Sequence, residues 1–449
     1  MTGLGAQMHA LVERLYPLCR SITGDGVRDT LDIVGEYVPL TVHEVPSGTQ
    51  VLDWTVPQEW NIRDAYIADA TGKRVVDFAA SSLHVLGYSV PVSATMPLSE
   101  LRGHLHTLPE HPSWVPYRTS YYTPDWGFCL AQETLDALPD GEYEVCIDST
   151  LADGHLTYAE HVIHGQVPDE VIFSCHVCHP SLANDNLAGI AVATSLARAL
   201  AEQKPYYTYR FIYAPGTIGA ITWLARNAQR VNGASPAHGG RPARAKPSVG
   251  EGPRAGGKVK HGLVLACAGD PGRLTYKQSR RGDAEIDRVL RHVLAASERP
   301  HQVVEFTPYG YDERQYCSPG FDLGVGSLSR TPYAAYPEYH TSADNPDFVS
   351  PAAMADTLAV CREACAVLDR NRRYRNLSPY GEPQLGRRGL YDALGGRSDT
   401  KQAQLAMLWV LNLSDGEHDL LHVAERSGLP FDTVAAAAGA LHGAGLIEA

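Results

Sequence analysis

Residues 174–189, with the sequence SCHVCHPSLANDNLAG, constrain the fold of this chain more than any other stretch. An apolar run typical of a short buried strand comes directly before them, and an alanine-rich run with helical character follows them. This order predicts that His176, His179 and Asp185 lie on a loop between the carboxyl end of a strand and a helix. Open α/β sheets bind their ligands at such loops.

Two interpretations of this loop are open at this point. Imidazole and carboxylate groups held close together suit a zinc-type metal ion. A turn rich in Asn and Asp would have the same composition if its histidines only capped and packed against the backbone. None of the spacings is as diagnostic as the HExxH motif, so the stretch alone does not decide between metal binding and a structural turn.

The chain after about residue 160 alternates between strand-like and helix-like segments. Such alternation is typical of α/β proteins, so we expect a mostly parallel sheet flanked by helices. The strands expected in this part are 171–173, 209–213, 261–270 and 321–325. The loops after these strands contain, in order, His176 with Asp185, then Gly216, Asp270 and His340.

The chain has 449 residues, which is too many for one ordinary core, so we expect several domains. Residues 1–45 and 117–380 are predicted to form the main α/β domain, with a small β-rich domain inserted at 46–116. Residues 230–260 are rich in Gly, Pro, Ala and basic residues without an apolar period, which indicates a surface insertion. Three short helical patterns and a β-tail at 381–449 predict a winged helix.

Winged helices commonly read DNA, but this one lacks the side chains for it. The segment expected to act as recognition helix, 432–442, is nearly all alanine and contains no Arg or Lys. Contacts with phosphate need cations. We therefore expect this domain to serve packing or self-association into a homo-oligomer.

The overall composition excludes several classes of partner. A net charge of −13 argues against general binding to nucleic acid or to an anionic membrane. We find no apolar run long enough to span a bilayer and no signal peptide at residues 1–20. The nine cysteines are an odd number scattered through a long chain, so a cytoplasmic, reducing location is expected.

Four motifs together resemble those of one protein family, and they lie at 178–186 (CHPSLANDN), 268–270 (AGD), 311–320 (YDERQYCSPG) and 338–344 (EYHTSAD). The family is the aminopeptidase-like branch of the co-catalytic zinc aminopeptidases, a clan that also contains glutaminyl cyclase. Its members carry a small inserted β domain and a C-terminal winged helix, and are often encoded beside polysaccharide or natural-product biosynthesis genes. The resemblance covers nearly the whole chain except 230–260.

This resemblance implies a metal centre with one or two Zn²⁺ ions. His176 corresponds to the first metal histidine, and Asp185 to the carboxylate that bridges two metals. Asp270 corresponds to a ligand of one metal and His340 to a ligand of the other. His179 is the alternative ligand if the loop is aligned differently.

Two positions depart from the pattern of the family. Cys178 stands where the wider clan usually has an aspartate beside the metal histidine. Gly216 stands in the sequence PGTIGA at 215–220, where the branch has an acidic residue, as in PETIGS. Because glycine has no side chain, it can neither bind a metal nor accept a proton, and hydrolysis would lose the general base it needs.

Asp312, Glu313 and Glu338 are the candidates to replace that base, although each could instead pair with Arg314 or another cation. Glu338 or Asp312 could also hold the ammonium group of an aminopeptidase substrate. In the same motifs, Tyr311, Arg314 and Tyr339 are expected to contact the substrate. The predicted catalytic residues are thus Glu313, Asp312 and Glu338, and the predicted substrate-binding residues are Tyr311, Arg314 and Tyr339.

Three functions are consistent with these residues. The first is a metal-dependent hydrolase of an amide or peptide-like bond in a small biosynthetic intermediate. The second is an enzyme of the same fold with altered chemistry, such as amide formation or group transfer in natural-product biosynthesis. The third is a non-catalytic protein used in binding or assembly. For the first two, the partner is a small-molecule or peptide-like substrate.

Overall fold

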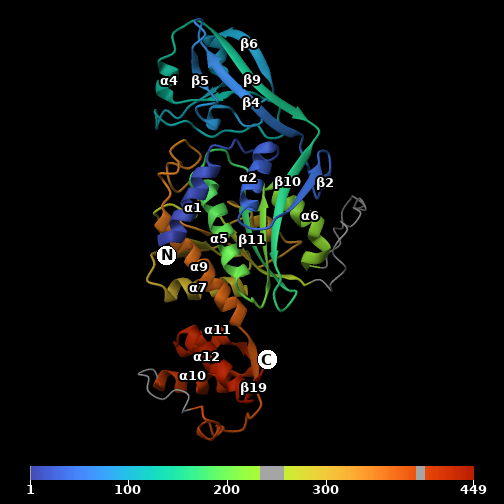
Figure 1. Ribbon diagram of the computed structural model, residues 1–449, viewed down its shortest axis with the longest axis vertical. Helices are drawn as coiled ribbons and strands as arrows, with labels where there is room; N and C mark the ends of the chain where they lie inside the picture. The colour runs from blue at the N-terminus through green and yellow to red at the C-terminus, as the bar shows by residue number, and fades with distance from the viewer. Residues whose placement is uncertain (1, 233–256, 391–399) are drawn as a thin grey trace. The chain divides into compact units, whose positions relative to one another are not determined.

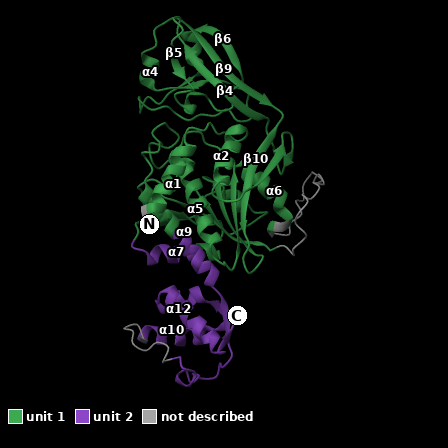
Figure 2. Cartoon of the chain, in the orientation of Figure 1, with its two compact units in different colours: residues 1–287, 299–359 green, residues 288–298, 360–449 purple. Residues whose placement is uncertain are grey.

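The computed structural model describes residues 2–232, 257–390 and 400–449. These residues form two compact units (Figure 2). The first comprises Met1–Asp287 and Arg299–Ala359, and the second comprises Arg288–Glu298 and Val360–Ala449. Most of the expected surface insertion at 230–260 lies outside the described residues.

A mixed sheet is the centre of the first unit (Figure 1). Its strands, in spatial order, are β1 (Thr41–Pro46), β10 (His155–Ile163), β12 (Thr208–Ala214), β11 (Glu170–His176), β13 (Val259–Leu265), β16 (Val325–Ser329), β14 (Leu274–Lys277) and β15 (His301–Val304). The four central strands β12, β11, β13 and β16 are parallel to one another, and β10 and β14 pair antiparallel with β12 and β16 at the two sides. The expected α/β fold with a mostly parallel central sheet is therefore confirmed.

The strand order explains where the polar loops meet. All residues of β11 and β12 are buried, as expected for central parallel strands. The chain passes from β11 to β12 in one direction along the sheet and from β12 to β13 in the other. Right-handed crossovers then place the connecting helices, α5 (Gly189–Ala201) and α6 (Ile218–Asn232), on opposite faces. The loops that precede these two helices consequently lie side by side, at the carboxyl edge of β11 and β12.

Other helices of the first unit cover this sheet or begin the loops around its edge. They are α1 (Thr2–Leu15), α2 (Asp25–Gly35) and α8 (Glu313–Tyr316), together with the first residues of α7 (Glu285–Ala296) and the first part of α9 (Pro351–Arg370), two helices that continue into the second unit. The alanine-rich α5 is buried over most of its length, because its small side chains allow close packing on β11. Helix α1 packs on α5, and α2 packs on β10.

A second sheet in the first unit consists of β5 (Arg74–Asp77), β4 (Glu59–Ala68), β9 (Glu142–Ala152) and β6 (Val92–Pro97), all antiparallel. Strand β9 is central, since it pairs with both β4 and β6. The predicted insertion at 46–116 therefore left out a strand of its own sheet. Strand β9 was missed as a member because it lies 45 residues after β6 in the chain and only the folded structure shows its partners.

Short elements complete this part of the chain. The strand pairs are β2 (Gln50–Val51) with β3 (Trp54–Thr55), and β7 (Leu105–His106) with β8 (Phe128–Cys129). The short helices are η1 (Ser82–His84), α3 (Leu98–Leu101), η2 (Arg102–His104), α4 (Gln132–Asp136) and η3 (Ala183–Ala188).

The second unit contains the predicted winged helix. Its helices are α10 (Thr400–Leu413), α11 (Leu420–Ser427), α12 (Phe431–Gly443) and the single turn η4 (Gly386–Arg388). A small antiparallel sheet joins β18 (Asp415–Asp419), β17 (Arg373–Asn376) and β19 (Ile447–Glu448). Strand β17 begins before residue 381, so the fold starts earlier in the chain than the helical patterns alone indicated.

One predicted strand was misplaced. We expected a strand at 321–325, whereas β16 begins at Val325 and continues to Ser329. Residues 318–322 form a turn instead, in which the Asp322 N–H donates to the Ser318 carbonyl.

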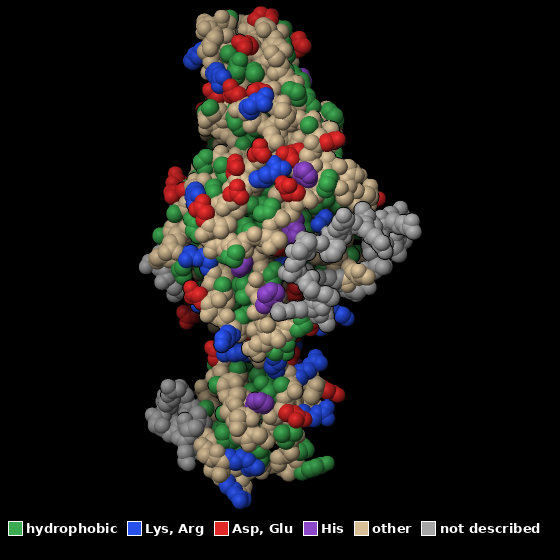
Figure 3. Space-filling view, turned by 45° about the vertical axis from the view of Figure 1, so that its right-hand side comes forward, with side chains coloured by type: hydrophobic (Ala, Val, Ile, Leu, Met, Phe, Trp, Pro, Cys, Tyr) green, Lys and Arg blue, Asp and Glu red, His purple; other side chains and the backbone are tan. Residues whose placement is uncertain are grey.

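The surface and the cysteines agree with the composition. On the face drawn in Figure 3, cationic and acidic side chains of the described residues are interspersed rather than separated by sign. All nine cysteines are free thiols. Among the helices of the described residues, none combines the length and the apolar character needed to cross a bilayer.

Candidate active site

The loop after β11 brings together three side chains that could hold a metal ion. One ligand atom from each of His176, His179 and Asp185 lies within 4.8 Å of the others. His176 is the last residue of β11, and Asp185 lies in η3, where the backbone leaves helical geometry at φ −111° and ψ 78°. The local fold therefore turns side chains nine residues apart in sequence toward one point.

Asp185 presents one oxygen to each of two histidines. Its Oδ1 is 2.9 Å from His176 Nε2, and its Oδ2 is 3.0 Å from His340 Nε2. Asp185 is 1% exposed, and burial alone would favour its neutral form. The neighbouring imidazoles nevertheless hold the pKa of Asp185 well below its usual range, and His176 and His340 do so through direct contact with its two oxygens. The structure thus brings His340 to the cluster from a loop 155 residues away.

The imidazoles differ in their protonation. Burial holds the pKa of His179 well below its usual value, so this ring is neutral and can donate a lone pair. Burial acts in the same direction on His176, but the contact with Asp185 outweighs it and raises the pKa of His176.

Asp344 fixes the backbone of the Asp185 loop from the opposite side. Its carboxylate accepts hydrogen bonds from Asn184 N (2.6 Å) and Asp185 N (3.0 Å), and its backbone carbonyl accepts one from Ala183 N (2.9 Å). Asp344 belongs to the same EYHTSAD motif as His340. This one motif therefore supplies a histidine to the cluster and the support for Asp185.

Arg20 holds the other end of the loop. Its Nε donates to the His179 carbonyl (2.8 Å), and its Nη1 donates to the Leu15 carbonyl (2.7 Å). The Ser181 hydroxyl donates to the Tyr16 carbonyl (3.0 Å). The sequence around Arg20 thus forms a platform under residues 179–181, a role that the sequence alone did not indicate.

Tyrosine rings surround the imidazoles. The Tyr339 ring stacks on His340 at 3.9 Å between centroids, and the Tyr311 ring lies parallel to His176 at 6.1 Å. The edge of Tyr117 meets both His179 (5.2 Å) and His340 (5.0 Å). Tyr311 and Tyr339, which were expected to contact the substrate, therefore lie beside the cluster, and Tyr117, which was not among the predicted residues, lies there with them.

The loop after β12 carries Gly216 directly beside the cluster. The Gly216 N–H donates to Cys178 Sγ at 3.2 Å. A Cβ atom at position 216 would lie 3.4 Å from that sulfur and 3.6 Å from His176 Cβ. The two departures from the family pattern, at 178 and 216, are therefore neighbours in space.

Asp312 reaches the Gly216 loop from another part of the chain. Its Oδ1 accepts a hydrogen bond from Thr217 N at 2.7 Å. Asp312 is buried, and burial raises the pKa of its carboxyl even though the charge of His176 and the Thr217 N–H oppose this. A carboxyl group with a raised pKa next to a histidine cluster is suited to accept a proton.

Glu313 and Glu338 lie in different surroundings. Glu313 is fully buried and its Oε1 accepts a hydrogen bond from Lys277 Nζ (2.7 Å), which is the structural role considered for it. Glu338 is partly exposed, and its backbone carbonyl accepts hydrogen bonds from Thr341. Arg314 Nη2 donates to Thr217 Oγ1 at 3.3 Å, so it contacts the Gly216 loop.

Asp270 is engaged elsewhere. Its carboxylate accepts hydrogen bonds from Thr331 Oγ1, Thr331 N, Gly272 N and Asn184 Nδ2. Strand β13 ends at Leu265, so Asp270 lies five residues beyond the strand and not at its tip as expected. Asp270 is not among the residues whose ligand atoms gather with Asp185 in the described part of the chain.

Cys267 lies nearer than Asp270 to the carboxyl end of β13, and no motif in the sequence indicated a role for it. Its Sγ accepts a hydrogen bond from the Tyr311 hydroxyl at 2.9 Å and lies 3.3 Å from that of Tyr336. The hydrogen bond from Tyr311 holds its ring in place, parallel to the ring of His176.

Comparisons with known proteins agree on the fold. The model of a family described as a domain of unknown function (DUF4910) matches residues 9–239 and 253–371, and a winged helix-turn-helix model matches 372–449. The chain belongs to the DUF4910 family. A curated protein of Clostridium acetobutylicum is 46% identical over 444 residues, which cover 99% of this chain and 96% of that protein. It is named, provisionally, a polysaccharide biosynthesis protein with an aminopeptidase-like domain.

Solved structures place this DUF4910 protein among the zinc aminopeptidase folds. A crystal structure described provisionally as a peptidase from Clostridium acetobutylicum has a TM-score of 0.88 and 44% identity, covering 100% of this chain and 97% of that one. A zinc aminopeptidase from Bacillus subtilis has a TM-score of 0.54 at 11% identity, covering 81% and 94%. A peptidase M28 precursor from Shewanella amazonensis has a TM-score of 0.55 at 14% identity, covering 82% and 95%.

The donors gathered at the cluster fit a zinc-type ion. Zinc in proteins is bound by imidazole nitrogens and carboxylate oxygens, and catalytic zinc sites have three protein ligands. His176, His179 and Asp185 supply such a set. A second ion would need further donors, and glycine at position 216 supplies none.

Proposed function

We propose that this protein is a metal-dependent hydrolase that cleaves an amide or peptide-like bond in a small biosynthetic substrate. The observation that supports this most directly is the convergence of His176, His179 and Asp185 within 4.8 Å, with His340 on the second oxygen of Asp185. The aminopeptidase-like fold is consistent with this chemistry but does not by itself establish it.

In the proposed site, His176, His179 and Asp185 hold one zinc-type ion, and His340 supports Asp185 or completes the set. A bound ion of this kind acidifies a water molecule and polarises a carbonyl group. Asp185 keeps its negative charge because the neighbouring imidazoles stabilise it, so it remains a ligand at neutral pH. Arg20 and Asp344 hold the two ends of the loop and keep the ligands in place.

Asp312 is the proposed proton acceptor. Its carboxylate lies against the loop that would carry the acidic residue in the family pattern, because it accepts the Thr217 N–H. Burial raises its pKa toward the range useful for proton transfer. Glu313 is less suited, since Lys277 holds one of its oxygens.

The tyrosines and Glu338 would position the substrate. Tyr117, Tyr311 and Tyr339 form an aromatic wall around the imidazoles, suited to exclude water from the reacting bond. Glu338 is partly exposed in the His340 loop and is the proposed partner of a substrate ammonium. A biosynthetic substrate is also consistent with the name of the Clostridium relative, which refers to polysaccharide biosynthesis.

Gly216 favours one alternative within the same fold. Without a carboxylate at this position, the site is less able to activate water and better able to protect an intermediate from hydrolysis. Amide formation or group transfer on the same metal cluster is therefore the second candidate function, in natural-product or polysaccharide biosynthesis.

The test combines metal analysis with hydrolysis of amino-acid p-nitroanilides. The wild-type protein should contain zinc near one equivalent, lose its hydrolytic activity when the metal is chelated, and regain it when zinc is restored. Asp312→Asn should lower kcat by at least about 100-fold, the lower end for general-base catalysis. Asp283→Asn is the matched control, because Asp283 is an exposed carboxylate paired only weakly with Arg281 at 3.7 Å.

Each result separates the candidate functions. Zinc far below one equivalent after gentle purification would contradict a metal enzyme and favour a binding or assembly role. Stoichiometric zinc without hydrolysis of any p-nitroanilide would favour altered chemistry. Equal kcat for Asp312→Asn and Asp283→Asn would reject Asp312 as the base.

A further inference from the structure

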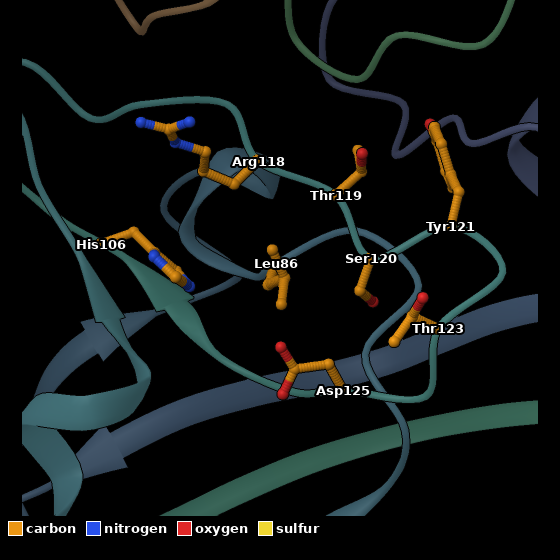
Figure 4. Close-up of a pocket in the computed structure, with 8 residues that line it drawn as sticks. All are labelled: Leu86, His106, Arg118, Thr119, Ser120, Tyr121, Thr123 and Asp125. Atoms are coloured by element: carbon orange, nitrogen blue, oxygen red, sulfur yellow. The ribbon is translucent and has the colours of Figure 1, made fainter.

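A polar cavity, open to solvent, lies in the first unit outside the histidine cluster (Figure 4), and three of the residues that line it, Arg118, Thr123 and Asp125, are exposed. Its volume is about 360 Å³. Its polar lining consists of His106, Arg118, Thr119, Ser120, Thr123 and Asp125. The side chain of Leu86 lies at its centre in Figure 4, with the Asp125 carboxylate directed toward it. Such a lining is unusual for a pocket that only completes an apolar core, since most of its groups are polar.

Backbone hydrogen bonds make this cavity a formed site. The Gly87 N–H donates to the Arg118 carbonyl (2.9 Å), and the Ser120 N–H donates back to the Gly87 carbonyl (2.9 Å). The Val90 N–H donates to the Asp125 carbonyl (2.9 Å). The two segments that carry the lining are therefore fixed to each other around Leu86.

Two tyrosines in contact with each other connect the lining of the cavity with the histidine cluster. Tyr121 lines the cavity, and its hydroxyl is 3.0 Å from the Tyr117 hydroxyl. The Tyr117 ring in turn meets His179 and His340. The Tyr117 N–H donates to the His340 carbonyl at 2.8 Å, which fixes Tyr117 to the metal loop. The Tyr121 side chain is directed away from Leu86 in Figure 4, so these two tyrosines separate a ring held in the cavity from the catalytic cluster.

The lining has hydrogen-bonding capacity that the protein does not use. One oxygen of Asp125 accepts the Trp126 N–H at 2.8 Å, which leaves the other oxygen as a free acceptor toward the cavity. Burial and the nearby charge of Arg118 lower the pKa of His106, so its neutral ring offers one donor and one acceptor. Thr119 and Thr123 add hydroxyl groups that can both donate and accept, while the Ser120 hydroxyl already donates to the Gly87 carbonyl at 3.3 Å and can still accept.

The charges and the size point to an uncharged ligand. Asp125 disfavours an anion inside the cavity, while Arg118, whose guanidinium is directed away from Leu86 in Figure 4, balances the charge at the rim. A volume of about 360 Å³ lies at the lower end of the ~300–1,000 Å³ range of small-molecule sites. A single ring with several hydroxyl groups matches both the volume and the alternating donors and acceptors.

We propose that this cavity binds a neutral, hydroxyl-rich ring, such as one sugar residue, as the part of the substrate that is remote from the amide bond. This assignment rests on the proposed hydrolase function for the catalytic cluster. The binding of the ring itself depends only on the cavity and can be measured without turnover.

The test uses two probes of similar shape. N-acetylglucosamine and N-cyclohexylacetamide share a six-membered ring and an acetamide, but only the first carries ring hydroxyls. Ligand-observed saturation-transfer NMR with the full-length protein should show binding of N-acetylglucosamine and not of N-cyclohexylacetamide. Asp125→Asn keeps the acceptor for the Trp126 N–H and should weaken N-acetylglucosamine binding by about tenfold, as expected for losing a charged hydrogen bond.

Controls separate this inference from the proposed function. Asp140→Asn changes an exposed carboxylate outside the cavity and should bind like the wild type, as should His176→Ala, which alters only the catalytic cluster. Thr123→Val is a second cavity variant in case Asp125→Asn does not fold, and it should also weaken binding. Equal binding of the two probes, or binding unaffected by both cavity variants, would overturn the assignment even if p-nitroanilides are hydrolysed. Selective sugar binding in a protein that hydrolyses no amide would uphold the cavity and reject the hydrolase.

Discussion

Two loops at the same edge of the sheet differ sharply in chemistry. The loop after β11 carries His176, His179 and Asp185, while the loop after the neighbouring strand β12 carries Gly216 and no acidic side chain. Each is held by a side chain from elsewhere, because Arg20 donates to the His179 carbonyl and Asp312 accepts from Thr217 N.

The difference separates metal binding from proton transfer. The first loop carries His176, His179 and Asp185, which could hold an ion, whereas the second has no side chain at position 216 that could accept a proton from a water molecule. In the proposed enzyme, such a site could bind its metal ion while its rate of hydrolysis depended on Asp312, a carboxylate from a different part of the chain. The predictions below test each half of this comparison.

The largest effect is expected from the metal-binding loop. Asp185→Asn removes the negative charge that the imidazoles of His176 and His340 face. It should weaken zinc affinity by more than about 100-fold, because mutating residues that only hydrogen-bond to metal ligands already costs ~10–100-fold. The measurement is competition with a chromophoric chelator. Asp283→Asn is the control and should bind zinc as the wild type does; unchanged affinity in Asp185→Asn would show that this loop is not the metal site.

The second effect concerns the loop that lacks a carboxylate. Gly216→Glu should raise kcat for p-nitroanilides by about 100-fold. This is the lower end of the range for general-base catalysis, because Asp312 already supplies part of that catalysis in the wild type. The new Cβ fits, because its nearest neighbour, Cys178 Sγ, lies at an ordinary 3.4 Å. Gly216→Gln has the same size without the charge and should give no gain.

A Glu variant no faster than the Gln variant would mean that position 216 does not limit hydrolysis. The absence of a carboxylate from the Gly216 loop would then have no effect on the rate of hydrolysis.

The smallest effect is expected from the support of the first loop. Arg20→Met should weaken zinc affinity by about tenfold, as for other residues that orient ligands. Arg20→Lys should recover part of this, because an ammonium can still donate to the His179 carbonyl but not also to that of Leu15. Affinity is compared at a temperature where all variants are folded, and equal affinity for Met and Lys variants would assign Arg20 to folding alone.

The sequence was sufficient for the architecture, because strand and helix periods are local signals. Buried strands such as β11 and β12 stand out as apolar runs, and the order of segments predicts that their loops meet. The same reasoning correctly brought His176, Asp185 and His340 together, since each follows a strand of the parallel region.

Features set by tertiary contact could not be predicted. Asp270 follows an apolar run without a break, and only the structure shows that β13 ends at Leu265 and that Thr331 engages the carboxylate. Strand β9 joins a sheet whose other strands precede it by many residues. The hydrogen bond between Gly216 and Cys178 likewise joins two positions that are 38 residues apart and were considered separately.

Asp185 faces a different imidazole with each of its oxygens. A carboxylate committed on both sides has no freedom to turn toward an incoming molecule, so it cannot take part in choosing among substrates. In the proposed hydrolase, selectivity would then depend on the tyrosine side chains around the imidazoles, Tyr117, Tyr311 and Tyr339, and not on this aspartate.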